Sequence, residues 1–172
     1  MSVCLTYRSE LIGDVPLVLM RTRYADNSNT AIMALSPTDD GEDFETFAYV
    51  TTNLGESLDA HEFFLDGDVA DMVDDLEEAN IARDTGIVGY SGYGQYRLMR
   101  IGDVAFDEMD EVDYDADEPC ERGMLALSRY MEDPSAFHID EFTTSRPMPS
   151  LPRGPITDGP SDGGDYEWDI PF

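Results

Sequence analysis

The side chains most used in catalysis and metal binding are rare in this 172-residue chain. It has two cysteines, Cys4 and Cys120, two histidines, His61 and His138, and no lysine. The lack of lysine excludes a Walker-type phosphate site and Schiff-base chemistry. A closed zinc site would need all four cysteine and histidine side chains, which lie far apart in the sequence, so we expect no zinc site. Two thiols fit a reducing compartment.

The glycine-rich stretch around residue 90 falls short of two catalytic motifs. Residues 89–93 read Gly-Tyr-Ser-Gly-Tyr, with tyrosine where a nucleophile elbow has its last glycine. Residues 92–97 place Arg97 where the dinucleotide fingerprint has its third glycine. We therefore predict that the chain is not an enzyme and binds no cofactor.

A calcium loop is the nearest metal motif in the acidic part of the chain. Asp113, Asp115 and Asp117 match the first, third and fifth positions of an EF-hand loop. Glu118 stands where the loop needs glycine, and Met124 where it needs a bidentate glutamate. We expect no specific metal site.

Carboxylates dominate the charge of the chain, with 38 acids against 10 arginines and a net charge of -28. Between Asp103 and Glu121 there are ten carboxylates and no base. Such a row can imitate nucleic acid, whose charges are spaced by about 3.4 Å per strand. The residues expected to form this mimic surface are Asp103, Asp107, Glu108, Asp110, Glu111, Asp113, Asp115, Asp117 and Glu118. The alternatives are a solvated loop that repels anionic partners, and an adaptation to high salt.

Aromatic and basic residues are concentrated in one place, at Tyr90, Tyr93, Tyr96, Arg97 and Arg100. The tyrosine rings could stack on bases and the arginines could pair with phosphates, so this cluster is a candidate binding site for single-stranded nucleic acid. The alternative is a glycine-rich turn whose tyrosines pack at a sheet edge and whose arginines pair with nearby acids. Given the net charge, we expect no binding to duplex DNA.

The pattern of apolar residues predicts an α+β fold, with a small, mostly antiparallel sheet and one helix. Strands are expected at residues 3–8, 15–23, 30–35, 44–52 and 95–101, and a glycine loop at 86–94. One helical stripe is formed by Val69, Met72, Val73, Leu76 and Ala79. A short helix is expected around residues 124–131, ending before Pro134.

Charge and composition divide the chain into three segments. Residues 1–101 form the expected α+β domain, and residues 102–144 an acidic extension that carries the short helix. Residues 145–172 are rich in proline, glycine and aspartate, which predicts a disordered tail. The longest apolar run near the N-terminus, residues 15–20, is too short for a membrane span and contains Pro16, so we expect a cytoplasmic protein.

Residues 29–101 resemble a family of small bacterial proteins of unknown function found on conjugative elements and prophages of gut bacteria. The residues that carry the resemblance are Ala31, Ile32, Asp40, Gly41, Glu42, Thr52, Asn53, Leu54, Phe63, Asn80, Thr85, Gly86 and the run 89–98. This chain has Gly94 where cysteine is frequent in the family. The resemblance implies a fold and a mobile-element setting, and it transfers no activity.

The end of the printed sequence resembles the C-terminal tip of bacterial single-stranded-DNA-binding proteins. The residues concerned are Asp165, Glu167, Trp168, Asp169, Ile170, Pro171 and Phe172. In those proteins the tip docks replication and repair enzymes through a pocket for the last phenylalanine and a basic residue for the terminal carboxylate. The resemblance implies a partner with a basic, apolar pocket.

Together these observations predict a non-enzymatic accessory protein of a mobile element that binds host DNA-metabolism proteins through the tip. One alternative is a nucleic-acid mimic that inhibits a host defence system by occupying a basic nucleic-acid-binding protein. A second is direct binding of single-stranded nucleic acid through the Tyr90 to Arg100 cluster.

Overall fold

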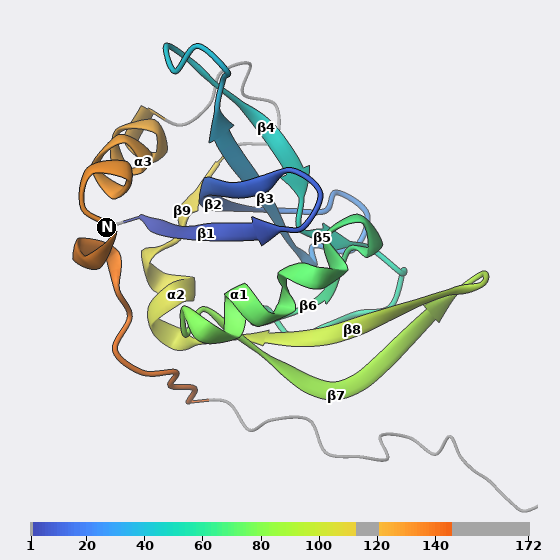
Figure 1. The fold of residues 1–172 in the computed structure, drawn as a ribbon. Helices are drawn as coiled ribbons and strands as arrows, with labels where there is room; N and C mark the ends of the chain where they lie inside the picture. Colours follow the sequence, from blue (N-terminus) through green and yellow to red (C-terminus); the bar gives the residue numbers. More distant parts are fainter. Residues whose placement is uncertain (1, 113–120, 146–172) are drawn as a thin grey trace, which may run out of the picture.

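The computed structural model describes residues 2–112 and 121–145, which form two β-sheets around a shared core (Figure 1). The first sheet contains β1 (Val3–Ser9), β2 (Gly13–Arg23), β3 (Thr30–Pro37) and β4 (Phe44–Tyr49), in that spatial order. Each of these strands is antiparallel to its neighbours. The short strand β9 (Asp110–Glu111) runs parallel to β2 and continues the line of β1 along the same edge.

The second sheet is smaller and also antiparallel. It contains β5 (Thr51–Thr52), β6 (Glu62–Leu65), β8 (Gly94–Ile101) and β7 (Ala82–Ser91), in that spatial order. The strands β7 and β8 form a long hairpin that extends away from the rest of the molecule (Figure 1).

Five short helices pack around the sheets. They are η1 (Gly67–Met72), α1 (Val73–Glu78), α2 (Asp103–Glu108), α3 (Glu121–Glu132) and η2 (Pro134–Phe137) within the described residues. None of the helices in this part of the chain has the length and apolar character needed to span a membrane.

The alternation of side chains along β2 explains why the first sheet is buried on both faces. Leu17 and Leu19 point into the main core between the two sheets, where they are fully buried. Val18 and Met20 point to the opposite face, where Leu127 of α3 covers them. Because successive residues of a strand face opposite sides, one strand joins two apolar clusters.

The structure confirms the α+β class and the mostly antiparallel pairing. The first three expected strands are present as β1, β2 and β3. The expected stripe lies on η1 and α1 from Val69 to Leu76, and Ala79 follows directly after α1. The expected single sheet is two sheets, since the predicted strand at residues 44–52 is split into β4 and β5 at Val50.

One local prediction was wrong. The glycine loop expected at residues 86–94 is mostly the second half of β7, with a tight turn after Ser91. Gly92 adopts a positive φ of 59° in that turn, a conformation that glycine tolerates and that closes the hairpin. The acidic extension expected from residue 102 begins with α2 and β9, and its Ala105 and Met109 are buried in the main core.

Candidate functional site

The first acidic residues of the expected mimic surface are engaged by neighbouring protein groups. Asp103 accepts a hydrogen bond from the backbone N–H of Ser145 through Oδ2, at 2.6 Å. Its Oδ1 lies 3.5 Å from Nδ1 of the buried His61. The His61 ring stacks on Phe106 of α2, with 4.0 Å between ring centroids. Asp103 therefore fixes the start of α2 to two other segments of the chain.

The acidic residues of β9 are also used within the fold. Asp110 is buried, accepts a hydrogen bond from the Ser2 hydroxyl, and lies 3.4 Å from the Nε of Arg122. Glu111 is 3.3 Å from an Nη of Arg21. These two carboxylates neutralise arginines and join β9 to β2 and α3.

The described part of the mimic surface is therefore not a continuous row of free carboxylates. Asp107 is exposed, whereas Asp103, Asp110 and Glu111 bind protein groups; Glu108 is partly buried. The sequence pattern could not show this, because the partners of these residues lie far away in the chain. Asp113, Asp115, Asp117 and Glu118 lie outside the described residues.

The three tyrosines expected to form a stacking platform lie on the hairpin of β7 and β8, but not on one face. Tyr90 pairs with Gln95 across the strands, and Tyr96 pairs with Gly89. Directly paired residues share a face and neighbouring pairs alternate, so Tyr90 and Tyr96 point to opposite faces. Tyr93 lies at the turn and is fully exposed.

The two arginines of the same cluster are separated as well. Arg97 forms an ion pair with Asp84 at 2.5 Å on the hairpin. Arg100 is 3% exposed and donates to Glu62 at 3.0 Å inside the protein. A buried guanidinium cannot reach a phosphate, so the described hairpin does not assemble the expected set of tyrosines and arginines.

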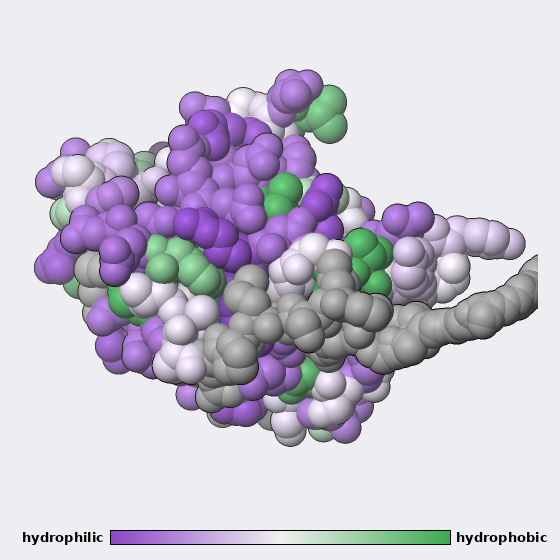
Figure 2. Space-filling model, turned by 90° about the horizontal axis from the view of Figure 1, so that it is seen from below, coloured by the Kyte–Doolittle hydropathy of each residue, from purple (hydrophilic) through white to green (hydrophobic). Residues whose placement is uncertain are grey.

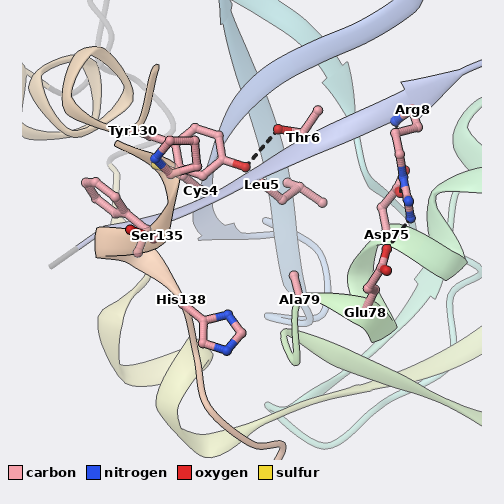
Figure 3. Close-up of a pocket in the computed structure, with 12 residues that line it drawn as sticks. Cys4, Leu5, Thr6, Arg8, Asp75, Glu78, Ala79, Tyr130, Ser135 and His138 are labelled. Carbon is pink, nitrogen blue, oxygen red and sulfur yellow. Dashed lines mark hydrogen bonds and ion pairs between the residues drawn. The ribbon is translucent and has the colours of Figure 1, made fainter. Parts of the chain in front are cut away.

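A pocket that the sequence did not predict lies between β1, α1, the end of α3 and η2 (Figure 3). Its volume is about 390 Å³. At one end, Nε of Arg8 donates to Asp75 at 2.6 Å, and its Nη2 donates to Glu78. At the other end, the hydroxyl groups of Tyr130 and Thr6 are 2.8 Å apart.

The charges and hydroxyl groups of this pocket suit a neutral or cationic polar ligand. Two carboxylates face one guanidinium, so this end of the pocket carries an excess of negative charge. Asp75 and Glu78 are three residues apart on α1, so they lie on the same helix face, and this spacing can be read from the sequence. Their pairing with Arg8 of β1 is a long-range contact, which the sequence does not show.

Cys4 lines the pocket without being activated as a nucleophile. Burial, helped by the nearby Asp110 carboxylate, raises the pKa of its thiol to about 12. The thiolate is the reactive form, so such a shift suppresses its chemistry. No three histidine, cysteine or carboxylate side chains within residues 2–112 and 121–145 are grouped so that they could hold a metal ion.

The surface of the described domain is largely hydrophilic on the face shown in Figure 2, with isolated apolar residues. Among the described residues, the most exposed large apolar side chains are Tyr93, at the turn between β7 and β8, and Leu11, between β1 and β2. Tyr90 of β7 and Ile12 come next. The tip formed by residues 165–172 lies outside the described residues.

These features define an α+β protein of two sheets with a charged surface. Residues 18–130 match the sequence profile of the family called Domain of unknown function (DUF4313), and the chain belongs to that family. The match extends from β2 to α3, beyond the resemblance expected for residues 29–101. No curated protein and no solved structure matches the chain.

Proposed function

We propose that this protein is a non-enzymatic accessory factor of a mobile element that binds host DNA replication and repair proteins through residues 165–172. The observation that carries the proposal is the sequence Asp169-Ile170-Pro171-Phe172, which follows Asp165, Glu167 and Trp168. This is the order of acidic and apolar groups that a basic pocket with an apolar floor would recognise.

The described domain binds the stretch of chain that precedes the tip sequence, at residues 142–145. The backbone N–H of Asp103 donates to the carbonyl of Thr143 at 2.8 Å, and the N–H of Ser145 donates to the Asp103 carboxylate. The Phe142 ring packs against the Arg83 guanidinium, 4.9 Å from its carbon. These contacts hold residues 142–145 on the surface of the domain.

The tip is expected to bind by two groups at once. In the 164–172 peptide, the ring of Phe172 is expected to enter an apolar pocket while the terminal carboxylate of the peptide meets an arginine or lysine of the partner. The peptide is ordered on binding, which uses part of the interaction energy, so the dissociation constant is expected to be micromolar. Charge contacts at a protein surface are worth about 0–1 kcal/mol each, so Asp165 and Glu167 are expected to contribute little.

The test is fluorescence anisotropy of a labelled peptide of residues 164–172 against a host exonuclease or RecQ-type helicase known to bind such tips. Deleting Phe172 should reduce binding to background. A C-terminal amide keeps the ring and removes the charge, and should be nearly as damaging. Replacing Asp165 and Glu167 by Asn and Gln should weaken binding only a few-fold. Equal binding with and without Phe172 would overturn the proposal.

A further inference from the structure

A groove of about 570 Å³ lies along the outer side of α3, between this helix, η2 and the first residues of the chain. Arg122, Leu125 and Arg129 line it at positions i, i+3 and i+7, which form one stripe of the helix. Ala126 and Phe137 also line it. The Leu125 side chain is 53% exposed, so the groove presents apolar surface to solvent between two cations.

Arg129 is exceptional among the arginines of this acidic chain. Within residues 2–112 and 121–145, the other arginines each form an ion pair or hydrogen bonds through the guanidinium, whereas Arg129 forms neither. Arg122 is 74% exposed at the other end of the stripe and reaches Asp110. The groove therefore combines exposed apolar surface with one guanidinium, that of Arg129, that has no partner among the described residues, in a molecule whose net charge is -28.

We propose that residues 165–172 of the same chain dock in this α3 groove. The segment has three carboxylates, at Asp165, Glu167 and Asp169, interleaved with aromatic and aliphatic side chains. Arginine binds carboxylates with two parallel hydrogen bonds, which suits Arg122 and Arg129. The rings of Trp168 and Phe172 are the groups that would cover the exposed apolar floor.

The acids that also line the groove give the docked segment a direction. Glu132 and Asp133 lie at the C-terminal end of α3, beyond Arg129. Carboxylates of the docked segment are repelled there, so they gather toward Arg122 and Arg129. A groove of this volume is within the range that accommodates one or two large side chains rather than a whole domain.

The chain is long enough to bring the segment to the groove. Ser145 is hydrogen-bonded to Asp103, and Arg122 is paired with Asp110. Asp103 and Asp110 are seven residues apart in the sequence, so their Cα atoms lie at most about 27 Å from each other. Residues 146–164 can span about 60 Å when extended, more than twice that distance.

Because residues 165–172 are covalently linked to the domain, weak contacts are enough to hold them in the α3 groove. A segment attached through a linker of this length is held near the groove at an effective concentration on the order of 1 mM. A docked state is then populated even when the separate peptide would bind only weakly. If the proposed function holds, docking withholds the tip from the host protein, and that partner must displace it.

Trp168 provides the measurement, because it is the single tryptophan of the chain. In the full-length protein, its fluorescence emission is expected to lie to the blue of the emission from the free 164–172 peptide. The double substitution Arg122→Glu and Arg129→Glu should move the emission to that of the free peptide. Sodium chloride at about 1 M should move it in the same direction, because it screens the ion pairs.

The matched control is Arg23→Glu, which reverses another exposed arginine, on β2, and should leave the blue shift unchanged. Circular dichroism verifies that each variant is folded. Emission from the native protein equal to that of the free peptide would overturn the proposal. So would a blue shift that survives the double substitution, because the segment would then be docked elsewhere.

The same variants separate this inference from the proposed function. The Arg122→Glu, Arg129→Glu protein should bind the host exonuclease or helicase about three-fold or more tightly than wild type, since its tip is always available. If the isolated peptide binds no host protein, the proposed function fails while the Trp168 result stands. If the peptide binds but native emission shows no docking, only the α3 groove inference fails.

Discussion

The thiol of Cys4 shows how the fold controls the chemistry of a single side chain. With its pKa raised to about 12 by burial and by the nearby Asp110, only about one molecule in 10,000 carries a thiolate at pH 8. In a Cys120→Ser variant, where Cys4 is the one remaining cysteine, alkylation by iodoacetamide should be very slow in native buffer. In urea the rate should rise to that of an ordinary cysteine. Rapid modification of the native variant would contradict the burial of Cys4.

Tyr7 gives a second residue whose ionisation reports on folding. Burial and a 2.6 Å hydrogen bond to Asp71 raise the pKa of its hydroxyl to about 12, compared with about 10 for an unfolded tyrosine. Between these values the unfolded chain loses the Tyr7 proton while the native protein retains it. The free energy of unfolding should therefore fall as the pH rises through this range.

The measurement is urea unfolding of wild type and Tyr7→Phe at increasing alkaline pH. Phenylalanine cannot ionise, so the variant should lose less stability over this interval, although it is less stable at neutral pH because Asp71 loses its donor. The difference in absorbance between the two proteins should show a tyrosine that titrates late. Parallel pH profiles for the two proteins would show that Tyr7 titrates normally.

At the scale of elements, the position of α3 depends on Gly123. A Cβ atom on this residue would lie 1.8 Å from the terminal methyl of Met20, which is fully buried on β2. Gly123→Leu should therefore push α3 away from the first sheet and destabilise the protein by about 1–3 kcal/mol. Ser128→Leu adds a similar side chain on the exposed side of the same helix and should change stability by less than about 0.5 kcal/mol. Urea unfolding that places both variants at the same midpoint would show that α3 does not pack closely on β2.

The elements that the sequence predicted best are those whose periodicity is continuous. The alternating pattern of β2 and the helical stripe from Val69 to Leu76 both reflect a face that must be buried, so the pattern is local and visible. The strand β7 was missed because Gly86 and Gly89 interrupt it and few of its side chains are buried. The short strands β5, β6 and β9 depend on pairing partners far away in the sequence, which no local pattern contains.

The sequence identified which residues could belong to each candidate site, but it did not show which of them lie together in space. The sequence identified the acidic stretch from Asp103, but not that Asp110 is buried against Ser2 and Arg122. It placed Arg100 with three tyrosines, whereas the structure buries it beside Glu62. The pairing of an arginine depends on tertiary contacts, so the one described arginine with no guanidinium partner, Arg129, could be recognised only in the structure.

At the scale of the whole molecule, the net charge of -28 is a property that no single contact accounts for. The few arginines are mostly used in ion pairs, and exposed pairs contribute only about 0–1 kcal/mol each. The remaining carboxylates repel one another more strongly in the compact state than in the expanded unfolded chain. Salt should therefore stabilise the protein, because it weakens more repulsions than attractions.

Thermal unfolding in sodium chloride measures this balance. The midpoint temperature should rise steeply from about 0.01 M to about 0.2 M salt, as the screening length falls from about 30 Å to less than 10 Å, and should then level off. Potassium chloride at the same ionic strength should give the same curve, because screening depends on charge rather than on the ion. A protein adapted to high salt would instead continue to gain stability above about 1 M and would be poorly folded at the lowest concentration. A midpoint that falls with added salt would mean that the ion pairs of Arg8, Arg21 and Arg97 outweigh the repulsion among the acids.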